Sequence, residues 1–431
     1  MQALVGWFGA STPPPAQQVS WRRVLPPAMA GLCIGLVFLV AGLEASGFSS
    51  TGPFTVGAHW GLAEGLAERG VEVTVASEVG YDGQWFLALA EDPLLRGDLA
   101  RRFDNPRYRA GRPLQSWLGW LLGAGRPVAI PLALLAIGPL AVGLGCAATA
   151  RIMSASGRGR SWGLAFALVP GVGVGVALAT AEPLALALAA VGLSLALDRR
   201  PGLAGLAFAG AALAKETYLA FAVAAGLHLV LARPAGLGAR LRAAVLAVAP
   251  AVAALAGWWV YLLGQVPALP DRGVALNVTA PLGLPLAGWP RWLWALGHYS
   301  PPTVLDAPGP AGAAFVAASL ALIAAGIVLG LRRRSLPARC ALVLGGYATL
   351  VGGLLATQFY SAMRVLAPCV FAALLAVATK ATTRPHPAER GRPTRQPGEE
   401  LAAHEAESFS TATISTSGPS SRNRSPAPRN Q

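Results

Sequence analysis

Residues 24–43 read VLPPAMAGLCIGLVFLVAGL and contain no charged side chain. A helix needs about 20 apolar residues to cross roughly 30 Å of hydrocarbon, so this run is long enough to span a bilayer once. Trp21-Arg22-Arg23 stands directly before it, and arginines at that end favour a cytoplasmic N-terminus. The run is long for a signal peptide and lacks a convincing cleavage site, so we expect an uncleaved signal anchor.

The composition of the chain is typical of a protein that crosses a membrane several times. Of 431 residues, 54% are apolar and only 13% are charged, about half the charged share of a soluble protein. The net charge is +14, but the basic residues stand at the ends of apolar runs or in the C-terminal tail, which argues against nucleic-acid binding. The cysteines and histidines have no metal-binding spacing, so the sequence indicates no metal site.

Apolar runs and arginine-rich turns alternate along the chain and predict about ten transmembrane helices. The positive-inside rule places the arginine-rich turns and both termini in the cytoplasm. As one helix, 202–232 would measure about 46 Å, and two short helices fit better because they keep the next arginine-rich turn on the cytoplasmic side. The arginine-rich turns are 151–160, 198–200, 233–242 and 332–334. The expected spans are 24–43, 127–150, a hairpin within 161–197 that bends at 181–183, two helices within 202–232, and 243–263, 311–331, 338–356 and 365–379.

The fold class that follows is an all-α polytopic protein of the cell membrane, in three parts. Residues 1–23 form a cytoplasmic N-terminus, and 24–379 form a multispan membrane domain with external loops at 46–126 and 264–310. Residues 380–431 form a cytoplasmic tail rich in Ser, Thr, Pro, Arg and Glu, a composition that predicts disorder.

Two segments of the predicted external loops are amphipathic and rich in tryptophan. In 114–122, Trp117 and Trp120 fall on one helix face, and 289–294 reads WPRWLW. Tryptophan is enriched where a helix lies at the membrane surface, so both segments predict interfacial helices.

Four charged residues fall at the predicted outer ends of membrane helices, on the side of the long first loop. They are Glu182, Lys215, Glu216 and Arg364. Ionisable groups close to hydrocarbon are costly and tend to be paired or functional. One interpretation is interfacial snorkelling or a structural Lys–Glu pair; the convergence of four such residues on one face favours a polar site.

The first loop carries the densest set of reactive groups. Tyr81-Asp82-Gly83-Gln84 places a carboxylate between glycines, which suits a tight turn. Alternatively, Asp82 caps the helix that starts near Gln84. Further along come Asp104-Asn105-Pro106 and Arg109-x-x-Arg112-Pro113, just before the second span.

Together these motifs resemble the integral-membrane glycosyltransferases of the GT-C superfamily, in particular its mannosyltransferase-like bacterial members. The long first external loop with its Tyr-Asp-Gly-Gln motif carries the likeness, and the acidic Glu182-Pro183 between spans three and four adds to it. The likeness covers about 1–380 in architecture, and its specific residues lie within about 79–113.

The resemblance implies an enzyme that moves a sugar from a polyprenyl-phosphate donor to an envelope glycan, lipid or protein acceptor on the external face. By it, Asp82 is the catalytic carboxylate that activates the acceptor hydroxyl. The implied substrate-binding residues are the cations Arg109, Arg112, Lys215 and Arg364 near the phosphate, the carboxylates Glu182 and Glu216, and Tyr81 and Gln84 beside Asp82.

The chain also departs from the family. Many members carry a paired acidic motif in the first loop, whereas Gly83 and Gln84 follow Asp82 here, so the resemblance implies no particular divalent metal or other cofactor. Lys215-Glu216 stands where an Arg-Pro pair is often found.

Two other functions remain open from the residues. A transporter or lipid flippase predicts ionisable residues at mid-membrane and symmetry-related broken helices, whereas the charges here fall at one face. A non-catalytic envelope-assembly protein would share the architecture without the chemistry.

The predicted topology has a direct test. Cysteines introduced at 105 and 275 should react with an impermeant thiol reagent in intact cells, because both positions lie in predicted external loops. A cysteine at 335 should not react, since it follows the arginine-rich turn 332–334. The parent protein reports the labelling of its native cysteines, and labelling of 335 in intact cells would contradict the topology.

Overall fold

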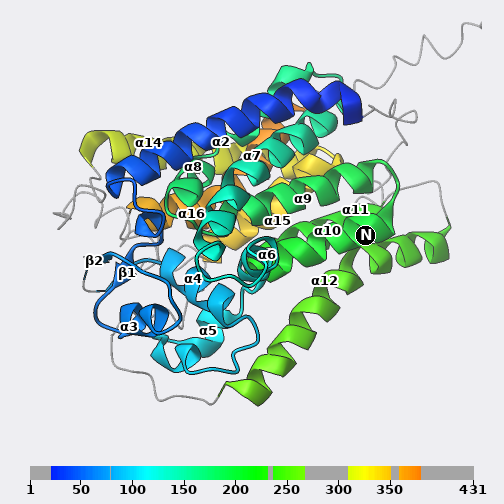
Figure 1. Cartoon of the computed structure of the whole chain (residues 1–431). Coiled ribbons are helices and arrows are strands. Elements are labelled where there is room, and N and C mark those ends of the chain that lie inside the picture. The colour runs from blue at the N-terminus through cyan, green and yellow to red at the C-terminus, as the bar shows by residue number, and fades with distance from the viewer. Residues whose placement is uncertain (1–20, 78, 232–235, 267–308, 351–358, 380–431) are drawn as a thin grey trace, which may run out of the picture. The chain divides into compact units, whose positions relative to one another are not determined.

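The computed structural model describes residues 21–77, 79–231, 236–266, 309–350 and 359–379. This part of the chain is mostly helical, with one two-stranded parallel sheet that pairs β1 (Val56–Gly57) with β2 (Val75–Ser77) (Figure 1). The all-α class is therefore confirmed. Residues 267–308 of the predicted loop 264–310, which include the predicted interfacial helix at 289–294, and the tail 380–431 lie outside the described residues.

An apolar helix occupies each position where a span was predicted. These helices are α2 (Leu25–Ala45), α7 (Ile130–Ala155), α8 (Pro170–Ala177), α9 (Glu182–Leu197), α10 (Pro201–Ala214), α11 (Leu219–Leu231), α12 (Leu237–Gln265), α14 (Gly309–Arg332), α15 (Leu336–Leu350) and α16 (Phe359–Ala378).

By length and composition, three of these helices can cross a membrane, namely α2 with the 3₁₀ turn before it, α7 and α12. A fourth is counted if the 3₁₀ helix η4 (Arg160–Phe166) and α8, which meet at a 58° bend, form one span. Over the residues whose side chains the structure describes, the remaining apolar helices are 10–17 residues long, so the total of about ten spans stays a prediction. The division of 202–232 into two helices is confirmed, because α10 ends at Ala214 and the 3₁₀ turn η5 (Glu216–Tyr218) precedes α11.

Proline marks where several of these helices begin. Pro170, Pro183 and Pro201 each lie at the first or second position of their helix, α8, α9 and α10. The first turn of a helix has no intrahelical partner for its N–H groups, so a residue without an N–H is tolerated there. The break that puts Glu182 at the start of α9 is therefore set locally by the Glu182-Pro183 sequence.

Helix α2 packs against its neighbours through glycines. The residues it buries are Pro27, Gly31, Gly35 and Gly42. A Cβ atom at Gly35 would lie 2.7 Å from the Cα of Pro139 in α7, closer than real contacts allow. Small residues let helix backbones approach closely, which is how helices associate where the hydrophobic effect gives no driving force.

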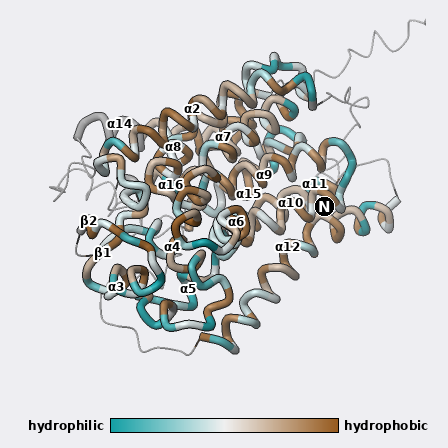
Figure 2. The backbone as a smooth tube through the Cα atoms, in the orientation of Figure 1, coloured by the Kyte–Doolittle hydropathy of each residue, from teal (hydrophilic) through white to brown (hydrophobic). Residues whose placement is uncertain are grey.

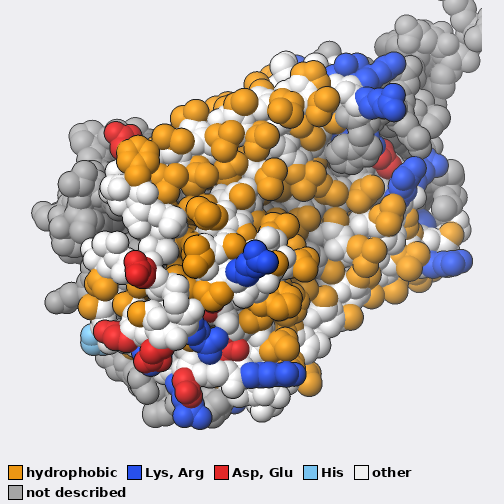
Figure 3. Space-filling model, in the orientation of Figure 1, with side chains coloured by type: hydrophobic (Ala, Val, Ile, Leu, Met, Phe, Trp, Pro, Cys, Tyr) orange, Lys and Arg blue, Asp and Glu red, His pale blue; other side chains and the backbone are white. Residues whose placement is uncertain are grey.

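The outward faces of the apolar helices are hydrophobic. Leu36, Val37 and Val40 of α2 are exposed, as are Val245 and Val260 of α12. In Figures 2 and 3, hydrophobic residues cover the apolar helices, while hydrophilic and charged residues gather over α3 to α5 and near helix ends on the opposite side. This distribution indicates a membrane protein.

The arginines of the predicted cytoplasmic turns bind the carbonyl oxygens at helix C-terminal ends. Arg158 Nε donates to Ala378 O (2.6 Å), and Arg240 Nη1 donates to Val230 O (2.9 Å). Arg333 Nη1 donates to Ala376 O and Thr379 O. Arg339, which lies in α15 and outside the predicted turns, donates in the same way from Nη1 to His228 O. Cations stabilise the negative ends of helices, so these residues have a structural role besides any effect on orientation.

The predicted first loop, 46–126, is a folded region of short helices. It contains α3 (Leu62–Ala67), α4 (Gly83–Glu91), α5 (Pro106–Ala110), α6 (Leu114–Leu122) and the 3₁₀ turns η2 (Gly52–Phe54) and η3 (Leu99–Arg102). Trp60, Trp85 and Phe103 form a buried aromatic cluster, with ring centroids 5.1 to 6.3 Å apart. The region is therefore packed, and its buried residues are continuous with the core of the apolar helices.

Helix α12 fastens this region to the apolar helices. Trp258 Nε1 donates to Ala110 O (2.7 Å), and Tyr261 Oη donates to Leu94 O (2.7 Å). Arg107 Nε, in turn, donates to Val266 O just beyond the end of α12 (2.9 Å). These three bonds join α5 and the loop after α4 to α12, close to the helices that carry the candidate site.

Trp117 and Trp120, which share one face of α6 in the prediction, have different surroundings in the structure, and the interfacial position of the helix stays a prediction. Trp117 Nε1 donates to Pro93 O (3.0 Å), and its ring packs edge-on against Trp258 at 4.9 Å. Trp120 is 43% exposed. Trp258 comes from α12, far away in sequence, so the periodicity of 114–122 alone does not reveal that Trp117 packs against protein.

The close approach of α2 and α7 predicts the effect of adding a single methyl group. Gly35→Ala should lower the free energy of unfolding by about 1–3 kcal/mol, because the new Cβ meets backbone that cannot move aside. Gly257→Ala on α12 is the matched control, since nothing lies within 4 Å of its Cβ position. Thermal unfolding in detergent compares the two variants, and equal melting temperatures would contradict the packing argument.

Candidate functional site

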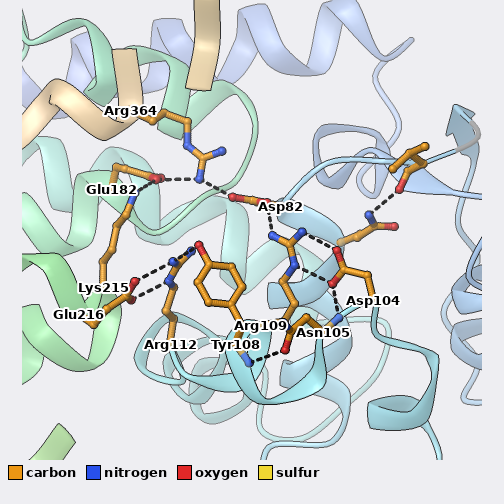
Figure 4. A network of polar contacts seen from close by, with 12 residues as sticks. Asp82, Asp104, Asn105, Tyr108, Arg109, Arg112, Glu182, Lys215, Glu216 and Arg364 are labelled. Atoms are coloured by element: carbon orange, nitrogen blue, oxygen red, sulfur yellow. Dashed lines mark hydrogen bonds and ion pairs between the residues drawn. The ribbon is translucent and has the colours of Figure 1, made fainter. Parts of the chain in front are cut away.

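The polar side chains singled out in the sequence meet in one network. Asp82 stands directly before α4, Glu182 begins α9, Lys215 and Glu216 lie in the break after α10, and Arg364 comes from α16. Arg109 lies in α5 and Arg112 in the turn after it. Figure 4 shows these side chains pointing toward one another from segments far apart in the sequence.

Asp82 is at the centre of the network. Its Oδ1 accepts a hydrogen bond from Arg109 Nη1 (2.7 Å), and its Oδ2 accepts one from Arg364 Nη2 (2.8 Å). The carboxylate makes no capping hydrogen bond to α4. The alternative that Asp82 serves only as a helix cap is therefore not what the structure contains.

The backbone around Asp82 is tightly packed, which fixes where its side chain points. A Cβ at Gly83 would lie 2.8 Å from Leu178 O and 2.9 Å from the Cα of Phe54, so only glycine fits between them. Gly80 has a φ of +77°, a conformation that glycine adopts without strain. The glycines on either side of Asp82 thus seat the start of α4 against the end of α8.

Gln84 acts on the same backbone. Its Oε1 accepts from Gly57 N (3.0 Å), its Nε2 donates to Val79 O (3.0 Å), and the residue is 1% exposed. Gln84 therefore positions the turn that carries Asp82; its predicted contact with substrate stays a prediction. Tyr81 lies with its ring 5.0 Å beneath the guanidinium of Arg364, a cation–π contact.

Arg364 connects Asp82 to the apolar helices. The same Nη2 atom that binds Asp82 also donates to Glu182 Oε1 (2.7 Å), and Lys215 Nζ donates to that oxygen as well (2.6 Å). The side chains of Glu182 and Arg364 are 1% and 5% exposed. One buried carboxylate thus holds two cations, one of which reaches out to Asp82.

Two further ion pairs flank this centre. Arg109 binds Asp104 with two parallel bonds, Nε to Oδ1 (2.8 Å) and Nη2 to Oδ2 (2.6 Å). Arg112 binds Glu216 in the same manner, with both bonds at 2.8 Å, and also donates to Tyr108 Oη (2.7 Å). Such bidentate pairs are stronger and more directional than single charge-assisted bonds.

The network balances its formal charges. Its cations are Arg109, Arg112, Lys215 and Arg364, and its anions are Asp82, Asp104, Glu182 and Glu216. An unpaired charge in such a place would be costly, and pairing offsets much of that cost. The most exposed side chains of the network are carboxylates. Those of Asp82 and Glu216 are 25% and 33% exposed, whereas no cation of the network exceeds 12%.

The arginines determine the protonation of Asp82. Partial burial would by itself raise its pKa, but the positive charges of Arg364, Arg109 and Arg112 outweigh this and hold the pKa of Asp82 well below its usual range. Asp82 is therefore ionised throughout the physiological range and, while both arginines bind it, is a weak base.

Asp104 and Tyr108 belong to the network although we did not single them out as site residues in the sequence. Asp104 stands five residues before its partner Arg109, and Tyr108 stands four before Arg112. Asn105 caps α5, with its Oδ1 accepting from Tyr108 N (3.3 Å), and so sets the start of the helix that brings these groups together. Both residues lie in the 104–113 segment that the sequence singled out, but their contacts depend on the cap that Asn105 forms on α5.

Within the described residues, no group of three or more His, Cys, Asp or Glu side chains is arranged to hold a metal ion. Comparisons with family models, with curated proteins and with solved structures found no match to this chain. The chemistry of the site therefore has to be argued from its own residues.

The buried pairing of Glu182 predicts a large effect on stability. Glu182→Ala should cost about 3–5 kcal/mol of unfolding free energy, because Lys215 and Arg364 lose a partner that they share deep in the protein. Glu68→Ala is the control: it removes an exposed pair with Arg102 and should cost less than about 1 kcal/mol. If thermal unfolding shows that both variants lose a similar amount of stability, the assigned burial of Glu182 is contradicted.

Proposed function

We propose that this protein is a membrane glycosyltransferase, which moves a sugar from a polyprenyl-phosphate donor to an envelope glycan, lipid or protein acceptor at the external face of the cell membrane. The observation that carries the proposal is the network around Asp82. A partly exposed carboxylate is held between the buried Arg364 and the largely buried Arg109, at the junction of a folded loop region and the ends of apolar helices.

Such a junction suits a substrate with both an apolar and a polar part. A polyprenyl chain is soluble in the hydrocarbon beside the apolar helices, and its phosphate and sugar stay at the surface. Arg109 and Arg364 would stabilise the negative charge that develops on the phosphate as it leaves. The more exposed carboxylates, Asp104 and Glu216 among them, would accept hydrogen bonds from sugar hydroxyls.

The proposed reaction needs one base and one leaving group. The acceptor oxygen forms a bond to the anomeric carbon while the bond from that carbon to the phosphate oxygen breaks. The proton of the acceptor hydroxyl goes to Asp82, and the electron pair of the broken bond stays on the polyprenyl phosphate. Asp82 can accept that proton only when its arginines bind it less tightly, and a bound phosphate would supply the competing negative charge.

One observation favours a second candidate function. The charged groups of the network neutralise one another in this structure, as they would in a latch that holds the loop region on the apolar helices. A non-catalytic envelope-assembly protein would need no more than this. A transporter or flippase gains no comparable support, because Glu182 and Lys215 lie at helix ends and Arg364 lies in the second turn of α16, so the network is gathered at one end of these helices.

A transfer assay on Asp82 variants tests the proposal. Purified protein should transfer radiolabelled sugar from a polyprenyl phosphate to an envelope acceptor. Asp82→Asn should lower the rate by about 10²–10⁴, because it keeps the size and polarity of the side chain but removes the base. Asp98→Asn, at an exposed carboxylate outside the network, should leave the rate unchanged.

Two results would contradict the assignment. Full activity of an Asp82→Asn protein of normal abundance would remove Asp82 from the chemistry. Absence of transfer by the parent protein, across several donors and acceptors, would favour the non-catalytic alternative.

A further inference from the structure

The most accessible side chains of the network are negatively charged, so they repel an anionic ligand. The side chains of Asp82, Asp104 and Glu216 are 20–33% exposed, whereas Arg364 and Arg112 are 5% and 8% exposed. A phosphate that approaches this site therefore meets carboxylates before it meets guanidinium groups. Displacement of one of these carboxylates would open the guanidinium groups to the phosphate.

The geometry differs among the carboxylates in a way that identifies the one that yields. Glu182 is 1% exposed and holds two cations, so its removal would strip a buried ion pair. Asp104 and Glu216 each hold one arginine through two parallel bonds. Asp82 holds each of its arginines through a single oxygen and a single bond.

Both arginines that bind Asp82 also have another carboxylate. If Asp82 turns away, Arg109 remains bound to Asp104, and Arg364 remains bound to Glu182. Each arginine keeps its position, and the N–H group that faced Asp82 becomes available to a ligand. The other three carboxylates offer no comparable exchange without losing a bidentate or buried pair.

We infer that Asp82 occupies an anion site formed by Arg109 and Arg364, and that the phosphate of the ligand displaces it, while Asp104 and Glu182 act as positioning residues that keep the two arginines in place. Phosphate binding and the release of the Asp82 carboxylate are then one event. The inference rests on the proposed function in its choice of a lipid phosphate as the anion. It goes further in assigning Asp82 as the competitor of that phosphate.

The inference predicts that loss of the Asp82 charge improves binding. Asp82→Asn should bind a short-chain polyprenyl phosphate at least about tenfold more tightly than the parent protein, because the ligand no longer displaces a charge-assisted partner. Binding is measured by calorimetry on the full-length protein in detergent. The matching polyprenol, which lacks the phosphate, should bind both proteins equally, and inorganic phosphate should show the same direction of change as the lipid.

Control variants separate this effect from the net charge of the protein. Asp98→Asn also removes one negative charge, from a side chain that is 81% exposed, and should leave the affinity unchanged. If Asp82→Asn does not accumulate, Asp82→Ala carries the same expectation. Equal or weaker phosphate binding by the Asp82 variant, no binding by either protein, or an equal gain in Asp98→Asn would overturn the inference.

The outcomes for the two proposals are distinguishable. Sugar transfer by the parent protein, together with equal phosphate affinity in Asp82→Asn, would keep the glycosyltransferase and remove the exchange. Tighter binding by Asp82→Asn without any transfer by the parent would keep the anion site and remove the enzyme.

Discussion

The site depends on two hydrogen bonds that the guanidinium of Arg364 donates, one to Asp82 and one to Glu182. Asp82 belongs to the folded 46–126 region, Glu182 begins an apolar helix, and Arg364 lies on another. Three separate parts of the chain are therefore held by one side chain that is almost completely buried. Because a buried cation without a partner is costly, Glu182 is the carboxylate that holds Arg364 in place, and it still does so when Asp82 turns away.

The remaining ion pairs extend this arrangement outward. Lys215 completes the pairing of Glu182, while Arg109 links Asp82 to Asp104. Each cation of the network has a carboxylate partner, and the most accessible groups are acidic. The site is therefore neutral as it stands, and in the proposed exchange an anionic ligand changes the pairing. Bonds from α12 hold the loop region in place, so such a change can be confined to side chains.

Much of this architecture could be predicted from the sequence, because it depends on local signals. The uncharged run 24–43 and the Glu182-Pro183 break mark helices and helix starts by composition alone. The alternation of arginine-rich turns put Glu182, Lys215 and Arg364 at helix ends on one predicted side, and the structure brings them into contact. Counting the predicted spans was enough to place these three residues on one side, without any knowledge of how the helices pack.

What the sequence did not reveal depends on contacts between distant segments. Trp117 packs inward because Trp258 meets it from α12, and no periodicity within 114–122 encodes that partner. Gln84 is occupied by the backbone of Gly57, 27 residues earlier. Asp104 reaches Arg109 only because Asn105 caps α5 between them. The order of synthesis adds a consequence: Arg364 lies on α16, the last of the described helices along the chain, so Asp82, Glu182 and Lys215 are made before it. Until α16 has been made, Lys215 is the one of these two cations that can neutralise Glu182, so their ion pair can protect the carboxylate during assembly.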